Sequence, residues 1–229
     1  IPGSAAAIRA SRMLALPNVY TPFMHRGAWG DEPASVDTYR RADRVLALQT
    51  DEAEDYVAVG VPAERVGVSG ACVPQGVQGH LPTISAWRSS KRRLVVYLGV
   101  RQPHKGVSLL LSAATLLRTP TDVAVVGPGD ELTIPATHPD VNVVDVGRVC
   151  EEERATWLRS ADLLVLPSES ETFGLVLLEA WSVATPVLTS RIPSLRSLVE
   201  RSGGGQACSR DAKSLAQSIE SMLSDPERL

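Results

Sequence analysis

From residue 94 onward, short runs of apolar residues alternate with segments of helical length. The apolar runs are continuous in Val and Leu, without the period-two alternation of a half-exposed strand, which indicates strands covered on both faces. Glycine, proline or polar residues bound each run, as is typical of strand ends. The predicted strands are 94–98, 122–126, 141–146, 163–166 and 186–190.

Helical segments separate these strands, at 105–117, 151–160, 172–183, 194–200 and 211–224. A strand, a helix and a further strand in regular succession predict an α/β fold with a parallel, doubly wound, Rossmann-like sheet. Sheets of this kind bind ligands at the carboxyl ends of their strands. We therefore expect the functional residues in the loops that follow the strands.

The first part of the chain repeats this pattern less completely. Strands are predicted at 18–21, 44–48 and 65–69, and a helix at 51–59, in which Asp51 and Glu54 have the spacing of a capping box. The stretch 71–90 is rich in Gly, Pro, Gln and Ser and is interpreted as an interdomain linker. We expect a partial N-terminal domain with its linker at 1–85 and a C-terminal domain at 86–229.

Composition adds bounds to this picture. A chain of 229 residues that is 44% hydrophobic and 21% charged is long enough for one large or two small domains with a buried core. The net charge of -3 and the pI near 5.9 give no reason to expect a nucleic-acid partner. No apolar run approaches the ~20 residues of a membrane span.

The cysteines and histidines do not suggest a metal site. The three cysteines are odd in number, far apart and without metal-ligand spacing, so we expect reduced thiols in a cytoplasmic protein. The histidines other than His25 do not cluster either. These residues are Cys72, Cys150, Cys208, His80, His104 and His138. The chain opens on Ile1 without an initiator Met or signal peptide and stops just after a helical pattern, so both ends are interpreted as cut.

The segment 168–180 carries the most informative chemistry. Glu171 follows a buried strand and falls in a loop at its carboxyl end. Gly174 falls in the first turn of the next helix, where backbone N–H groups and the helix dipole favour an anion such as a diphosphate. Glu179 lies two turns into this helix, which is apolar enough to be buried nearly all round. An unpaired carboxylate there would cost several kcal/mol, so either ribose hydroxyls or an arginine must satisfy it.

Glu171 and Glu179, separated by seven residues and followed by the strand at 186–190, resemble the Glu-x7-Glu signature of family 4 (group 1) glycosyltransferases. The resemblance implies a GT-B fold and retaining transfer from a nucleotide sugar. It implies that Glu171 sits on the reacting face of the donor sugar and that Glu179 holds the ribose. It also assigns the diphosphate to the backbone around Phe173, Gly174 and Leu175.

The resemblance continues along the chain, from 93 to 229, in order. The loop 98–106 is similar to the family's Gly-Arg-Leu-x3-Lys-Gly loop and places Lys105 at a phosphate-binding position. The segment 125–129 resembles the next strand and turn. The segment 146–149 resembles the turn that binds the base, which implies this role for Arg148 and Val149.

Three positions leave alternatives open. The family's loop arginine corresponds to Val100, while Arg101 stands one place later, so Arg101 either reaches the phosphate or has a surface role. Lys105 either binds phosphate or is a solvated lysine in the first helical turn. The family has glycine where this chain has Ala184, a change that is tolerated unless the turn needs a positive φ. The series Gly203, Gly204 and Gly205 is interpreted as a helix stop and turn without a binding role.

The front part fits the same family less tightly. Residues 17–25 are similar to the strand that ends in a family histidine near the donor sugar, so His25 either contacts that sugar or is structural. Residues 39–60 resemble the passage that leads to the interdomain crossing. The resemblance places the family's opening strands before Ile1 and its terminal helix after Leu229.

Together these features predict a retaining hexosyltransferase with Glu171 and His25 as catalytic residues and with no metal or cofactor. The expected partners are a nucleoside diphosphate sugar and a sugar, lipid or small-molecule acceptor with a hydroxyl group. A peripheral membrane contact through the absent N-terminal part is also left open. Two alternatives remain: a GT-B sugar-nucleotide epimerase or phosphorylase, and a non-catalytic fragment that binds nucleotide sugars.

Overall fold

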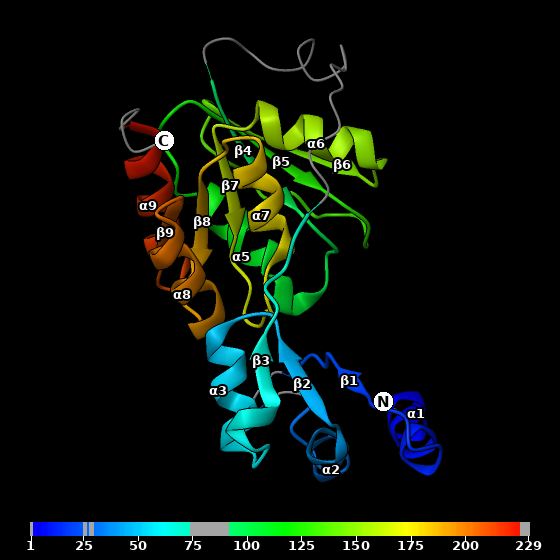
Figure 1. Cartoon of the computed structure of the whole chain (residues 1–229). Coiled ribbons are helices and arrows are strands. Elements are labelled where there is room, and N and C mark those ends of the chain that lie inside the picture. The colour runs from blue at the N-terminus through cyan, green and yellow to red at the C-terminus, as the bar shows by residue number, and fades with distance from the viewer. Residues whose placement is uncertain (1, 25–26, 28–29, 74–91, 225–229) are drawn as a thin grey trace. The chain divides into compact units, whose positions relative to one another are not determined.

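The computed structural model describes residues 2–24, 27, 30–73 and 92–224 (Figure 1). The chain divides into two compact units. The first contains Ile1–Cys72 and Glu171–Phe173, and the second contains Val73–Ser170 and Gly174–Leu229. The predicted boundary at residue 85, almost all of the predicted linker, His80 and His25 lie outside the described residues, so the expectations for them stay predictions.

A six-stranded sheet, parallel throughout, forms the centre of the second unit (Figure 1). Its order is β6-β5-β4-β7-β8-β9. The chain starts at β4, winds outward through β5 and β6, and then returns beside β4 to wind the other way, so the predicted doubly wound topology is confirmed. The strands are β4 Arg93–Leu98, β5 Thr121–Val126, β6 Val141–Gly147, β7 Leu163–Leu166, β8 Val187–Ser190 and β9 Gly205–Cys208.

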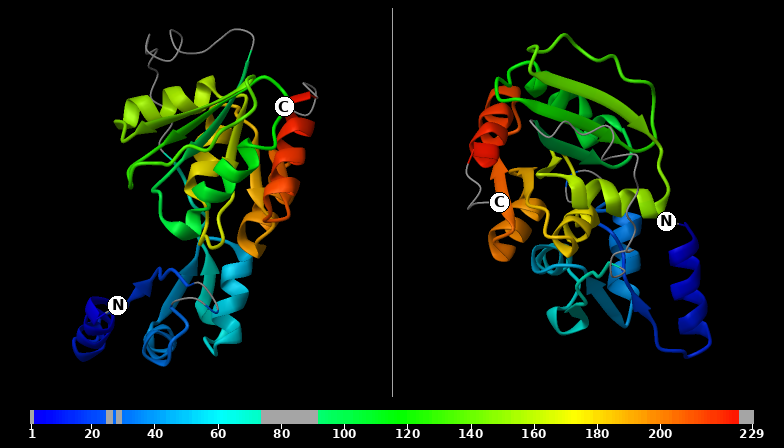
Figure 2. Two further views of the ribbon diagram at one scale, coloured as in Figure 1. Left: turned by 180° about the vertical axis from the view of Figure 1, so that it is seen from behind. Right: turned by 90° about the horizontal axis from the view of Figure 1, so that it is seen from above.

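Helices cover both faces of this sheet (Figures 1 and 2). One face carries α5 and α9, which pack against each other, and the other carries α6, α7 and α8. Strands β5, β7 and β8 are buried along their whole length, as their continuous apolar runs predict. The helices are α5 Val107–Ala114, α6 Glu151–Ser160, α7 Leu175–Ser182, α8 Pro193–Ser202 and α9 Ala212–Ser224.

The glycine series after α8 has a different role from the turn that we expected. Gly203 does end α8, with φ 68°. Gly205, however, begins β9, and a Cβ there would overlap the Val187 carbonyl oxygen of β8. A Cβ on Gly204 would lie 2.4 Å from Nε1 of Trp181, and this Nε1 donates a hydrogen bond to the Gly204 carbonyl at 2.8 Å. The last two glycines therefore allow the edge strand to approach β8 and α7.

The first unit has a small parallel sheet in the order β1-β2-β3. Helix α3 packs on β2 and β3, and α1 packs against α2. Helices α1 and α2 were not predicted. The elements are α1 Pro2–Met13, β1 Val19–Tyr20, α2 Pro33–Arg41, β2 Arg44–Ala47, α3 Thr50–Ala58, the 3-10 turn η1 Ala63–Arg65 and β3 Val66–Val68.

The capping box predicted for α3 is wrong. The helix begins at Thr50, one residue earlier than expected, and its N-cap Gln49 makes no side-chain capping bond. Instead, Glu52 reaches back, and its Oε2 accepts a hydrogen bond from the Leu48 backbone N–H at 2.7 Å. The Tyr56 hydroxyl donates to the other carboxylate oxygen at 2.7 Å. Burial raises the pKa of Glu52.

Helix α7 is shorter and less buried than its sequence predicts. It has eight residues, of which Leu177 and Ala180 are buried, while Leu175 is 47% exposed. The expectation of burial nearly all round is therefore wrong, because this helix presents one side to the solvent. In the described part of the chain, no helix combines the length and the apolar character needed to cross a membrane.

Candidate functional site

Two loops meet at the carboxyl edge of the second unit's sheet, where the strand order reverses between β4 and β7. The His104 carbonyl in the first loop accepts a hydrogen bond from the Glu169 backbone N–H in the second, at 2.7 Å. Gly106 has φ 77°, and a Cβ there would overlap the Pro167 carbonyl. A glycine is needed at this contact both for its backbone conformation and for its lack of a side chain. The two segments that carry the predicted phosphate-binding groups are thus joined.

The loops after β5 and β6 belong to the same edge. The Gly127 backbone N–H donates to the Gly147 carbonyl at 2.8 Å, and the Arg101 backbone N–H donates to the Pro128 carbonyl at 2.9 Å. A Cβ on Gly127, which has φ 133°, would overlap the Gly99 carbonyl oxygen. All four motifs that the sequence analysis found in the second unit therefore lie on connected loops.

Lys105 ends the 3-10 turn η2, Pro103–Lys105, two residues before α5 begins. The sequence pattern predicted Lys105 in the first turn of α5, but the residue lies before that helix begins. Its backbone N–H donates to the Gln102 carbonyl at 2.9 Å, and the residue is partly buried instead of fully solvated. Lys105 thus lies in the loop between β4 and α5, and its contact with a phosphate stays a prediction.

Gly174 forms the N-cap of α7 and has left-handed backbone angles, φ 77° and ψ 56°. A Cβ there would lie 2.8 Å from Cδ2 of Leu195, so a larger residue would be strained and crowded. The first N–H groups of a helix have no partner within it and attract anions. In α7 these first N–H groups belong to Leu175 and Val176. Phe173, just before, is buried.

Glu171 falls in the short segment that groups with the first unit. Within that unit, the Gln49 side-chain amide donates to the Thr172 carbonyl at 3.0 Å, and Gln49 is 4% exposed. Glu171 itself is partly buried. Its contact with a donor sugar stays a prediction.

Glu179 has an ion-pair partner. Its Oε2 lies 2.6 Å from Nη2 of Arg154 on α6, and its side chain is 24% exposed. Arg154 also lies 3.4 Å from the Glu151 carboxylate. The salt bridge with an arginine, one of the two alternatives, is therefore present, and the pair is half-buried instead of deep in the core. A ribose contact by the same carboxylate stays a prediction.

Arg101 occupies a different setting from either alternative. Its side chain is 4% exposed, which excludes a surface role. Its guanidinium forms two hydrogen bonds with the Asp145 carboxylate of β6, one of them from Nη1 to Oδ2 at 2.7 Å, and Nη1 also donates to the Asp130 carbonyl at 3.1 Å. The guanidinium holds the pKa of Asp145 below its usual range. Phosphate binding by Arg101 would have to compete with this pair.

Asp145 was not among the functional residues predicted from the sequence. A signal was available, since Asp145 is an acidic residue inside the apolar run of β6, and a buried carboxylate is expected to have a cationic partner. Its Oδ2 also accepts from the Leu132 backbone N–H at 3.4 Å. Asp145 therefore holds both the loop after β4 and the segment after β5.

The two residues predicted to bind the base, in the turn after β6, differ in exposure. Arg148 is exposed, while Val149 is partly buried and packs against the core. The next residue, Cys150, caps α6, and its backbone N–H donates to Glu153 Oε2 at 2.9 Å.

The three cysteines are free thiols. Among the described residues, no three His, Cys, Asp or Glu side chains come together as metal ligands would.

Comparison with known families and proteins supplies independent findings. The family model described as "Glycosyl transferases group 1" matches residues 92–225. The D-inositol 3-phosphate glycosyltransferase of Thermobispora bispora is 32% identical over 211 residues, covering 82% of this chain and 49% of that protein. The phosphatidyl-myo-inositol mannosyltransferase of Propionibacterium freudenreichii is 29% identical, covering 67% and 42%. The chain spans about half the length of the curated relatives it matches.

Solved structures show the same fold. HepE from Anabaena, in complex with UDP and glucose, superposes with a TM-score of 0.80 at 18% identity, over 98% of this chain and 67% of that one. The sucrose-phosphate synthase of Thermosynechococcus elongatus gives a TM-score of 0.75 at 20% identity, over 98% and 64%. The predicted GT-B fold is confirmed.

Proposed function

Because this chain belongs to the group 1 glycosyl transferases, we propose that it transfers a hexose from a nucleoside diphosphate sugar to an acceptor hydroxyl, with retention of configuration. The joined loops at the carboxyl edge of β4 and β7 carry this proposal. One brings Lys105, the other leads into the N-terminus of α7, and the Glu169–His104 hydrogen bond holds them together. A cation beside helix N–H groups is suited to a diphosphate.

In this proposal the residues divide the donor between them. Lys105 and the amides at Phe173, Gly174 and Leu175 neutralise the charge that develops on the leaving diphosphate, which makes a metal ion unnecessary. Glu179 binds the ribose, with Arg154 holding its carboxylate in place. Arg148 and Val149 contact the base. Glu171 and His25 act at the donor sugar.

The setting of Arg101 supports a positioning role in the same reaction. Its ion pair with Asp145 and its bond to the Asp130 carbonyl connect the loops after β4 and β5 to strand β6. The phosphate would then depend on Lys105 and the helix amides, with Arg101 acting through the shape of the loops. This differs from the direct phosphate contact that the family resemblance implies.

The names of the relatives support one acceptor class. Several are called D-inositol 3-phosphate glycosyltransferases, and we propose a phosphorylated cyclitol as the acceptor. Release of UDP or GDP from a panel of nucleotide sugars, measured with and without inositol phosphate, tests this. Release that depends on the acceptor supports transfer, and epimerisation without release would point to the alternative enzyme class.

The donor site is tested by calorimetric titration of UDP and GDP into the chain. Lys105→Ala is expected to weaken binding roughly 10- to 100-fold, the loss of one charged hydrogen bond. Lys213→Ala, on the exposed first turn of α9, is the matched control and should leave affinity unchanged. Equal affinities for both variants would refute the site.

A second titration distinguishes the roles proposed for the two glutamates. Glu179→Gln should weaken nucleotide and nucleotide sugar alike, by about 1–3 kcal/mol, and so act mainly on KM. Glu171→Gln should spare nucleotide affinity and lower kcat when transfer to the acceptor is measured. If Glu179 serves only its ion pair with Arg154, the melting temperature will fall in Glu179→Gln while nucleotide affinity stays intact.

A further inference from the structure

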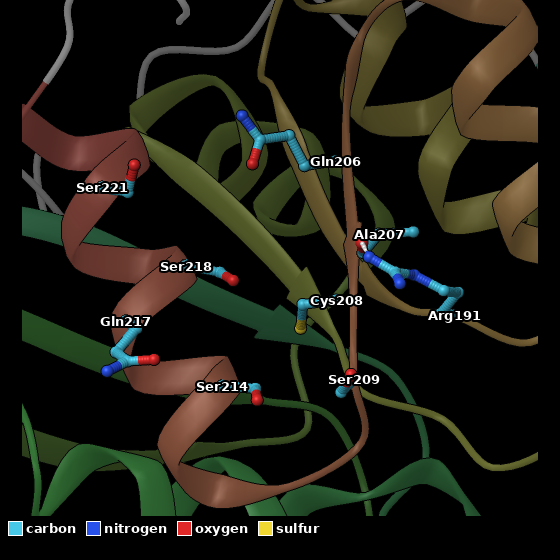
Figure 3. A pocket seen from close by; sticks show the side chains of 9 residues that line it. All are labelled: Arg191, Gln206, Ala207, Cys208, Ser209, Ser214, Gln217, Ser218 and Ser221. Atoms are coloured by element: carbon cyan, nitrogen blue, oxygen red, sulfur yellow. Dashed lines mark hydrogen bonds between the residues drawn. The ribbon is translucent and has the colours of Figure 1, made fainter.

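A second concave site lies away from the joined loops, along the outer edge of the same sheet. It is a pocket of ≈ 350 Å³ lined by the edge strand β9, by helix α9 and by Arg191, which follows β8 and in Figure 3 lies on the other side of the β9 ribbon from α9. The lining residues are Arg191, Gln206, Ala207, Cys208, Ser209, Ser214, Gln217, Ser218 and Ser221. None of them carries a role in the proposed transfer.

The lining has the chemistry of an anion site with further hydrogen-bonding groups. It offers one guanidinium, two carboxamides and four serine hydroxyls, and none of the described residues that line it is acidic. Ser214 and Ser218, one helical turn apart on α9, both line the pocket, and Ser218 extends toward Cys208 on β9 (Figure 3). A ligand here would meet hydroxyl groups, amide groups and a cation.

Arg191 is exposed and contacts β9 through both its backbone and its side chain. The Arg191 backbone N–H donates to the Cys208 carbonyl at 2.8 Å, and its Nη2 donates to the Ala207 carbonyl at 3.3 Å. Because a guanidinium has five N–H donors, this bond leaves donors for an anion.

Two acidic residues near the pocket are held by backbone N–H groups, Glu220 by residues outside the lining and Asp211 by the lining residue Ser214. The Glu220 carboxylate on α9 turns away and accepts hydrogen bonds from the backbone N–H groups of Arg118 and Thr119, at 2.6 and 3.2 Å. Asp211 caps α9, its Oδ1 accepting from the Ser214 backbone N–H at 2.8 Å. Burial raises the pKa of the Cys208 thiol, so the thiol stays neutral and does not repel an anion.

We propose that this pocket binds a small phosphate monoester that also carries hydroxyl groups, such as a monosaccharide phosphate. Arg191 would hold the phosphate, and the serine and glutamine side chains would hold the hydroxyls. The volume is at the lower end of the ~300–1,000 Å³ of small-molecule sites, which suits a monosaccharide phosphate better than a nucleotide sugar.

The pocket is also connected to the β7 loop. Arg210, which follows the lining residue Ser209, pairs with Glu169 at 3.1 Å between Nη2 and Oε2. Glu169 in turn donates its backbone N–H to the His104 carbonyl of the β4 loop. A ligand in the pocket would therefore lie one ion pair away from the loops of the proposed donor site.

The test is calorimetric titration of glucose 6-phosphate and of inorganic phosphate into the 229-residue chain, with UDP as a third probe. We expect saturable binding of glucose 6-phosphate, at least about tenfold tighter than inorganic phosphate, since only the sugar reaches the hydroxyls of α9. Arg191→Gln should weaken glucose 6-phosphate at least about tenfold and leave UDP affinity unchanged. Arg196→Gln is the control, since this exposed arginine on α8 pairs with Glu200 outside the pocket.

Ser214→Ala combined with Ser218→Ala should reduce the preference for the sugar phosphate over inorganic phosphate. The proposal is overturned if glucose 6-phosphate fails to saturate, if Arg191→Gln and Arg196→Gln bind it equally, or if UDP displaces it from the wild-type chain. If inorganic phosphate binds as tightly as the sugar phosphate, the serine side chains do not hold the sugar hydroxyls. Because UDP is followed in parallel, these outcomes are distinct from a failure of the donor site.

Discussion

The two units are built from the same kind of parallel sheet, but they bury it to very different degrees. In the second unit, helices cover both faces and the inner strands are buried throughout. In the first, β1 and β3 contain no fully buried residue, and Met13, at the end of α1, is 87% exposed. Parallel sheets are stable when both faces are covered. The second unit meets this condition within the described residues, and the first does not.

The family model follows the same division, since it matches only residues 92–225. The segment 13–19 of the first unit displays Met13, Leu14, Leu16 and Val19 to solvent. Contiguous exposed apolar residues mark surfaces that another segment or molecule covers. A strand pattern alone therefore does not give an independently stable layer, because stability depends on what packs against each face.

Hydrogen exchange on the whole chain should separate the two sheets most clearly. Amides of β4, β5 and β7 should exchange at least about a thousandfold more slowly than those of β1, β2 and β3, a difference of roughly 4 kcal/mol in local opening. The edge strand β9 should fall between them, because it has one strand neighbour. Equal protection in both sheets would contradict the difference in stability inferred from burial.

Next in size is the buried ion pair of the second unit. Arg101→Leu leaves the Asp145 carboxylate without its partner and should cost about 2–3 kcal/mol of unfolding free energy, less than for a fully buried pair because Asp145 is partly exposed. Arg41→Gln is the control in the first unit, since Arg41 and Asp37 form an exposed pair on α2. Urea denaturation should show no measurable change in unfolding free energy for this control.

The same pair predicts a pH dependence. Because the pKa of Asp145 is lowered in the folded state, its stabilisation is complete above about pH 4, the usual aspartate value, and is lost as the pH falls through the folded pKa. The deficit of Asp145→Asn relative to wild type should therefore shrink below pH 4. A deficit that stays constant down to pH 2 would contradict the ion pair as its cause.

Glu52 should give the opposite pH dependence in the first unit. Burial raises its pKa, so the protonated form favours folding, and the contribution is lost as the pH rises from about 4 through the folded pKa. We expect the local stability of β2 to decrease over this pH range, as measured by hydrogen exchange with correction for intrinsic rates. Glu52→Gln should remove this dependence, and a local stability that rises with pH in wild type would contradict it.

The smallest expected effect on stability concerns two alanines, each with a positive φ just after a helix. Ala184 has φ 61° after α7, where its N–H donates to Trp181 O and the next N–H donates to Ala180 O, the Schellman pattern. Ala15 has φ 54° after α1 with the same pair of bonds. Because this conformation strains alanine, Ala184→Gly should raise stability by about 0.5–1 kcal/mol.

Ala15→Gly is the matched variant in the other unit. If the first unit opens before the second, this change should leave the main unfolding midpoint where it is, while Ala184→Gly raises it by roughly 2 °C. Equal shifts in calorimetric scans would mean that both units unfold together. The condition attached to Ala184 in the sequence is met, since the turn does need a positive φ.

Local sequence pattern was enough for much of the fold. The strands 94–98 and 163–166 are continuous apolar runs, and they form β4 and β7 with ends shifted by no more than one residue. The helix predicted at 151–160 has the same bounds as α6. Strand β9 was missed because Gly205, Gln206 and Ala207 have low strand propensity, and only pairing with β8 makes them a strand. Helices α1 and α2 lack the flanking apolar runs from which the other elements were recognised.

The candidate site likewise has features that the sequence predicts and others that depend on the fold. The amino-acid pattern was sufficient to predict a parallel doubly wound sheet, its ligand-binding edge and the glycines that let loops approach there, because periodicity and backbone freedom are local properties. The same pattern could not identify the partners of the charged residues. Arg101 and Asp145 are 44 residues apart, and Arg154 and Glu179 are 25 apart. These pairs depend on the three-dimensional packing, because a buried charge is satisfied by whichever opposite charge folding brings within hydrogen-bonding distance.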